Sequence, residues 1–131
     1  MELVNVLAAG VAGFAFGAVW YTLLGSTWAQ LSGVPLDENG LPANRSNPLP
    51  YIRGFVAMII VAGMMRHVFS LSGVDTAGEG LISGLGIGAF MAAPFMATCY
   101  GFAGRSRRLM LIDGGYAAFG SAVIGLVLTL F

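Results

Sequence analysis

The chain has 131 residues, of which 57% are hydrophobic and only 9% charged, and its formal net charge is zero. A soluble domain carries roughly a quarter charged residues because its surface faces water. Six arginines, six acidic residues and no lysine cannot keep a chain this apolar in solution. The composition excludes a soluble globular domain, and a net charge of zero gives no reason to expect nucleic acid binding, which usually needs a basic face. We therefore expect an integral membrane protein whose main partner is the lipid bilayer.

Residues 3–24 form the first hydrophobic segment and include no charged side chain. At roughly 1.5 Å per residue the segment is on the order of 30 Å long, which matches the hydrocarbon thickness of a bilayer. A cleaved signal peptide is the alternative, but the run is too long for one and no basic region precedes it. The segment is therefore predicted to be a retained transmembrane helix.

Residues 26–50 form the one sizeable polar stretch and contain four of the five prolines and the turn-like sequence Asp-Glu-Asn-Gly. These residues favour turns over regular structure, so we predict a loop. Its beginning, 26–31, is compatible with a short helix in the membrane interface with Trp28 at headgroup depth. Trp20 and Tyr21, near the end of the first helix, are predicted to be interfacial aromatic residues as well.

The second segment, residues 51–72, has Arg53 near its start and is interrupted by Arg66 and His67. Only twelve uncharged residues separate the two arginines, so a re-entrant or interfacial element is the alternative. The residues after His67 are again apolar, and for that reason we favour a complete span.

Two further apolar segments complete the chain. The third, 80–103, is uncharged and contains Pro94, and the fourth, 108–131, carries Asp113 as its single charged residue after the first position. Together the four segments predict one all-α domain, an integral membrane four-helix bundle.

Four spans place the first and third loops on one side of the membrane, and that side collects five of the six arginines. Positive charge is enriched in cytoplasmic loops. We therefore expect a multi-pass protein of the bacterial inner membrane with both polar loops in the cytoplasm and both termini on the periplasmic side. The five arginines are Arg45, Arg53, Arg105, Arg107 and Arg108.

Charged residues inside a span are the default candidates for function, because each costs roughly 2.5–3.5 kcal/mol at the bilayer centre. Asp113 lies about one turn into the last predicted helix, where the positive end of the helix dipole stabilises a carboxylate. We favour a cap or an anchor over a proton carrier for Asp113. Arg53, which enters the membrane from the same side, is its expected partner.

Arg66 is harder to accommodate, because it precedes the end of its span and its side chain leans toward the membrane centre. We favour an arginine that extends to the interface, with Glu79 or Ser83 on the next helix as its partner. The alternative is a buried site formed by Arg66 with His67.

Glycines recur at four-residue spacing in two of the predicted helices. This spacing lets helix backbones approach closely, either inside a bundle or between protomers. We therefore predict helix-packing faces. Their members are Gly13 and Gly17 in the first helix and Gly80, Gly84 and Gly88 in the third.

No group of residues indicates a catalytic, metal or cofactor site. His67 is the single histidine, and one imidazole without neighbouring ligands does not indicate a metal. Cys99 is the single cysteine and is expected to be a small buried apolar residue. The Gly-Leu-Gly-Ile-Gly sequence over 84–88 follows no strand, so a dinucleotide loop is rejected. We expect no enzymatic activity and no cofactor.

Two motifs are the most distinctive parts of the chain. The first runs from Gly17 to Tyr21 (Gly-Ala-Val-Trp-Tyr) and is followed by Gly25 and Trp28; the second is Leu-Ile-Asp-Gly-Gly-Tyr over 111–116. With the four-span layout they resemble the bacterial family catalogued as domain of unknown function 1761, over nearly the whole chain. Members of that family often carry Asn at the position of Asp113, which implies that a charge is not required there. The resemblance supports the topology and implies no activity.

These observations favour a non-enzymatic packing or accessory protein that associates with other membrane proteins. A small homo-oligomeric transporter or channel is the alternative, for which Asp113 is the available membrane carboxylate.

Overall fold

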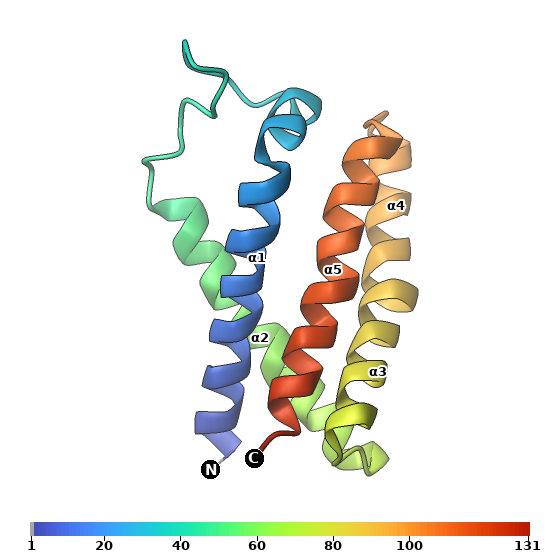
Figure 1. Ribbon diagram of the computed structural model, residues 1–131. Helices are drawn as coiled ribbons and strands as arrows, with labels where there is room; N and C mark the ends of the chain where they lie inside the picture. The colour runs from blue at the N-terminus through green and yellow to red at the C-terminus, as the bar shows by residue number, and fades with distance from the viewer. Residues whose placement is uncertain (1) are drawn as a thin grey trace.

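The computed structural model describes residues 2–131, and every regular element in that range is a helix (Figure 1). Four of its helical stretches are long and apolar enough to cross a membrane, which confirms the predicted all-α bundle. A π-helical segment, Gly88–Ala92, joins α3 and α4 into one continuous span. The helices are α1 (Glu2–Ser32), α2 (Leu49–Ser72), α3 (Ala77–Ile87), α4 (Ala93–Phe102) and α5 (Arg107–Leu128).

The first helix is longer than the sequence predicted. α1 does not end near residue 24 but continues to Ser32, so the segment 26–31 belongs to the same helix and the loop covers only residues 33–48. No proline precedes Pro35, and the helix stops where Gly33 adopts a positive φ of 77°. At 31 residues, α1 is roughly 46 Å long, which exceeds the roughly 30 Å thickness of the hydrocarbon region.

The second span is a continuous helix and not a re-entrant element. α2 includes Arg66 and His67 and ends at Ser72, followed by the cap residue Gly73, whose φ is 72°. Its first turn contains Pro50, a position at which the missing N–H has no helical partner to lose. In the preceding loop, the carboxylate of Asp37 accepts a hydrogen bond from the backbone amide of Leu41 and forms an ion pair with Arg45. The hydrogen bond from the Leu41 amide, and after it the contact with Arg45, lower the pKa of Asp37 below its usual value.

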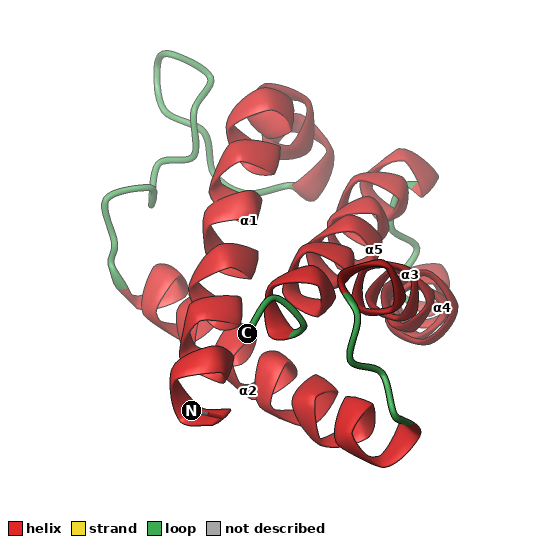
Figure 2. Ribbon diagram, turned by 60° about the horizontal axis from the view of Figure 1, so that its bottom comes forward, coloured by secondary structure: helices red, strands yellow, loops and turns green. Residues whose placement is uncertain are grey.

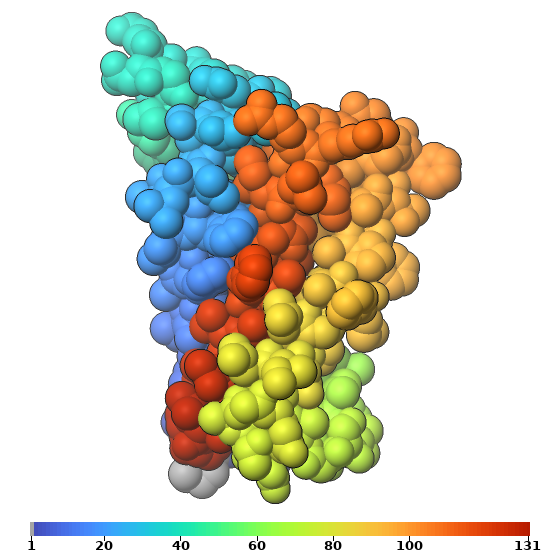
Figure 3. Space-filling model, turned by 45° about the vertical axis from the view of Figure 1, so that its right-hand side comes forward, coloured from blue at the N-terminus to red at the C-terminus, as the bar shows by residue number. Residues whose placement is uncertain are grey.

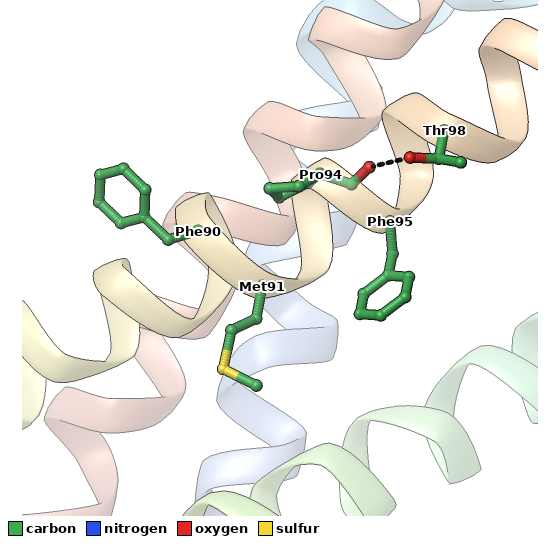
Figure 4. A pocket seen from close by; sticks show the side chains of 5 residues that line it. All are labelled: Phe90, Met91, Pro94, Phe95 and Thr98. Atoms are coloured by element: carbon green, nitrogen blue, oxygen red, sulfur yellow. Dashed lines mark hydrogen bonds between the residues drawn. The ribbon is translucent and has the colours of Figure 1, made fainter.

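The third span begins at Ala77, where Thr76 and Glu79 form a reciprocal capping box. Its middle widens into the π-helical segment shortly before Pro94. A proline ring presses on the carbonyl group four residues earlier, and the wider turn relieves that contact. The hydroxyl of Thr98 donates to the Pro94 carbonyl oxygen, four residues earlier in the same helix, at 3.0 Å (Figure 4).

The first half of the third span, α3 and the beginning of the π-helical segment, lies directly against α5. A Cβ atom at Gly84 would overlap the carbonyl oxygen of Ser121, and one at Gly88 would overlap that of Ala117. Gly80 lies equally close to Gly125. Close backbone approach of this kind is how small residues hold transmembrane helices together.

The apolar core lies at the end of the bundle that holds both termini (Figures 1 and 2). There α5 packs between α1 and α3, while α2 crosses obliquely and diverges from α5 toward the long loop. The other end of the bundle is therefore built mainly from α1, α4 and α5. The buried core residues are Ala9, Ala62, Met65, Phe69, Ile124 and Leu128.

Candidate functional site: a carboxylate between two tyrosines

Asp113 is buried between three helices at the end of the bundle opposite the termini. Its side chain is 9% exposed. The hydroxyl of Tyr21 on α1 donates to Oδ1 at 2.5 Å, and the hydroxyl of Tyr100 on α4 donates to Oδ2. One carboxylate thus connects the first, third and fourth spans.

Trp20 and Ile112, the residues that precede Tyr21 and Asp113, form a second contact between α1 and α5. The indole Nε1 of Trp20 donates to the carbonyl oxygen of Ile112 at 2.9 Å. The ring of Trp20 lies over Gly115, where an added Cβ would be 2.7 Å from the ring. A side chain at residue 115 would therefore displace the indole ring.

Tyr116 extends the same interface by one turn. Its hydroxyl donates to the Gly13 carbonyl oxygen at 3.1 Å, and its ring occupies the space that a side chain at Gly17 would need. Its ring centroid lies 5.5 Å from that of Tyr21 in an edge-to-face arrangement, which is favourable for aromatic pairs. Tyr21 also meets Trp28 edge to face at 5.9 Å.

The two motifs that stood out in the sequence therefore pack on each other. Residues 17–21 of α1 provide the indole, one tyrosine and a glycine surface, and residues 112–116 of α5 provide the carbonyl, the carboxylate, a glycine and the other tyrosine. The predicted interfacial aromatics Trp20, Tyr21 and Trp28 are all half-buried within the protein.

The expected ion pair between Asp113 and Arg53 is not formed. Arg53 is exposed in the first turn of α2, and the ion pairs of residues 2–131 do not include it. The reason is the course of α2, which at this end diverges from α5 (Figure 1). Tyrosine hydroxyls occupy both carboxylate oxygens instead.

Arg66 also has a different partner from the one predicted. Its Nη2 lies 3.7 Å from Oε1 of Glu2 on α1, whereas Glu79 is engaged in the cap of α3. His67 is exposed, so it does not form a buried site with Arg66. Consecutive residues of a helix point to different sides, so Arg66 lies toward α1 whereas His67 lies on the surface.

Sequence reasoning missed Asn5, which is 2% exposed. Its amide donates to the carbonyl oxygen of Leu128 at 2.9 Å and to that of Phe131. Asn5 stands among apolar residues in the first span, and a polar side chain in such a run is itself a signal for an interhelical hydrogen bond. Cys99, expected to be buried, is instead exposed on α4.

The chemistry of the site is that of a hydrogen-bonded anchor. The carboxylate has its donors within the bundle, and no group of three or more metal-binding side chains occurs in residues 2–131. Two shallow surface hollows lie outside the site. The hollow on α1 is lined by Ala18, Val19, Thr22 and Leu23. The hollow on the third span is lined by Phe90, Met91, Pro94, Phe95 and Thr98 (Figure 4).

Comparison with known proteins gives a family and nothing more specific. No curated protein and no solved structure matches the chain. The family model described as "protein of unknown function (DUF1761)" matches residues 4–129, a range that includes both interlocking motifs. The chain belongs to the DUF1761 family.

Proposed function

We propose that this protein is a non-enzymatic accessory subunit that packs the outer face of α4 against another membrane protein. The observation that carries the proposal is that α4, half of a membrane span, has no buried residue. It packs mainly against α5 and the π-helical segment. Most of its circumference is therefore free for contact inside the membrane.

The exposed face is rich in large side chains. Phe95 is 75% exposed and Phe102 93%, and Met91 projects from the same side of the helix as Phe95 (Figure 4). Aromatic side chains and methionine are enriched in protein–protein interfaces relative to the rest of the protein surface. The π-helical segment supports the same proposal, because such segments occur often at functional sites.

The glycine faces are not part of the proposed contact, because they are occupied inside the bundle. Gly80, Gly84 and Gly88 are used against α5, and Gly13 and Gly17 lie against Ile124 and Tyr116. The proposed contact is therefore one of large side chains on α4 and not a glycine zipper between protomers.

The proposed location is a bacterial inner membrane with both termini on the periplasmic side. Five of the six arginines lie in or beside the two loops at the end opposite the termini. Positive residues favour the cytoplasmic side of a bilayer, which supports this orientation.

Purification from native membranes in a mild detergent, followed by native mass spectrometry, tests the proposal. We expect a complex of this chain with a larger membrane protein in a fixed ratio. Phe95→Ala is expected to reduce the retained partner by about 30-fold, the effect of losing one central contact residue. Leu23→Ala is the matched control, because Leu23 is 78% exposed on α1, and it should retain the partner. Recovery of the chain without a partner, or equal losses in the two variants, would contradict the proposal.

A second candidate function is a small homo-oligomeric transporter or channel. It is favoured by the buried carboxylate of Asp113, which has no cationic partner among residues 2–131. Intramembrane carboxylates often line proton or ion pathways. Reconstitution in vesicles distinguishes the candidates: a pH- or ion-gradient flux that Asp113→Asn abolishes would favour transport over the accessory role.

A further inference from the structure

Three arginines surround the beginning of α5. Arg105 lies in the turn after α4, and Arg107 and Arg108 are the first two residues of the helix. All three are exposed. The segment that contains them forms one edge of the molecule beside the end of α1 (Figure 3).

None of these three guanidinium groups forms an ion pair within residues 2–131. The ion pairs of residues 2–131 are Arg45 with Asp37 and Arg66 with Glu2. The guanidinium of Arg105 donates to the carbonyl oxygen of Ser32 at the end of α1, which fixes its position but leaves its charge uncompensated.

The arginines do not stabilise their own helix. The N-terminus of a helix is the positive end of its dipole, where acidic residues are favourable and cations are not. The first turn of α5 has no acidic residue, and Ser106 provides its cap. Three cations at this position therefore point to an external anion.

The depth of the cluster identifies the source of that anion. Arg107 begins a membrane span directly, and Arg105 is bonded to Ser32, about one helical turn beyond Trp28. Tryptophan is typical of the headgroup region. At this level the abundant anions are the phosphate groups of phospholipids.

We propose that Arg105, Arg107 and Arg108 form a binding site for the headgroup of an anionic phospholipid. Guanidinium groups match phosphate oxygens in geometry and charge, and basic residues next to a span attract anionic lipids. The local balance of charge agrees, since the acidic residues on this side are Glu38, the already paired Asp37 and the buried Asp113. This inference does not depend on the proposed accessory function.

Native mass spectrometry of the detergent-purified protein, titrated with phosphatidylglycerol or phosphatidylcholine, tests the site. The wild type is expected to bind phosphatidylglycerol more tightly than phosphatidylcholine. Arg108→Gln should weaken phosphatidylglycerol binding by about five-fold, and Arg107→Gln with Arg108→Gln by roughly 25-fold, because each surface arginine contributes about that factor. Phosphatidylcholine binding should not change.

Two controls make the outcome decisive. Arg66→Gln removes one positive charge from the opposite end and should leave the preference intact. Inorganic phosphate, compared with sodium chloride at equal ionic strength, should displace no additional lipid. Equal affinity for the two lipids, an equal loss in Arg66→Gln, or displacement of the lipid by inorganic phosphate would each overturn the proposal. Melting temperatures in phosphatidylcholine show whether each variant is folded.

Discussion

Asp113 shows how a carboxylate can be accommodated in a membrane span without an arginine. A charged residue costs roughly 2.5–3.5 kcal/mol at the bilayer centre, but Asp113 lies toward one end of its span, about two turns into α5, and accepts hydrogen bonds from two tyrosine hydroxyls. Hydrogen bonds to a charged group contribute about 1.5–3 kcal/mol each. The two bonds offset the cost of placing the carboxylate there.

Substitutions at Asp113 should separate hydrogen bonding from charge. Asp113→Leu leaves the hydroxyls of Tyr21 and Tyr100 unsatisfied and is expected to destabilise the fold by about 2–4 kcal/mol. Asp113→Asn keeps polar groups in place for both tyrosines and should cost less than about 1 kcal/mol. Reversible unfolding in mixed micelles measures both values.

The tyrosines provide the control for this prediction. Tyr21→Phe and Tyr100→Phe each remove one hydroxyl and should each cost about 1–2 kcal/mol in the wild type but little in Asp113→Leu. If Asp113→Asn were as destabilising as Asp113→Leu, the negative charge and not the pair of hydrogen bonds would be the stabilising feature.

At the level of the helix pair, α3 and α5 approach so closely that side chains are excluded from the contact. The carbonyl oxygens of Ser121 and Ala117 occupy the space beside Gly84 and Gly88. Helices in lipid gain no hydrophobic stabilisation from mutual contact, so close packing provides much of the attraction.

Gly84→Ala is therefore expected to destabilise the bundle by about 1–3 kcal/mol, because the added methyl group must push the two backbones apart. Gly86→Ala is the matched control on the same helix, since no atom lies within 4 Å of its added Cβ. It should be neutral or slightly stabilising, as alanine favours helix. Unfolding of both variants in the same detergent measures the difference; equal stabilities would contradict the close approach.

Hydropathy was sufficient to predict the four spans, because a bilayer requires about 20 apolar residues per crossing. The end of α1 was not predictable in the same way. Residues 26–32 carry polar side chains but no helix breaker, and they remain helical because half-buried Trp28 and buried Ala29 pack within the protein. Tertiary contacts thus extended a helix whose local composition indicated a loop.

Which helices are neighbours could not be read from the sequence. Tyr21 and Asp113 are 92 positions apart. Without the arrangement of the helices, Arg53 was the expected partner because it enters the membrane from the same side. The four-residue glycine spacing was visible, but it did not reveal whether the faces met inside the bundle. The direction of α2 separates Arg53 from Asp113, and the position of α5 places the glycine faces inside the bundle.

For the whole molecule, the distribution of charge makes the two ends unequal. Five arginines lie in or beside the two loops at the end with the long loop, and Arg66 lies beside Glu2 at the end with both termini. This asymmetry predicts the orientation in the membrane through the preference of positive loops for the cytoplasm.

Cysteine labelling in intact cells measures that orientation. In a Cys99→Ser background, Asn44→Cys in the long loop should resist a membrane-impermeant maleimide, and Gly78→Cys near the other end should react. Both positions are exposed in the protein, and both should react after the membrane is permeabilised. Labelling of residue 44 from outside intact cells would contradict this orientation and place the long loop on the periplasmic side.

Site-specific photo-crosslinking in native membranes measures the proposed contact of α4 with a partner most directly, with benzoylphenylalanine at the position of Phe95 or, as the control, Leu23. Both side chains are largely exposed, Phe95 on α4 and Leu23 on α1. We expect one discrete adduct with a larger membrane protein from position 95 and none from position 23. Lipid adducts alone at both positions, or an adduct with the mass of two copies of this chain, would contradict it.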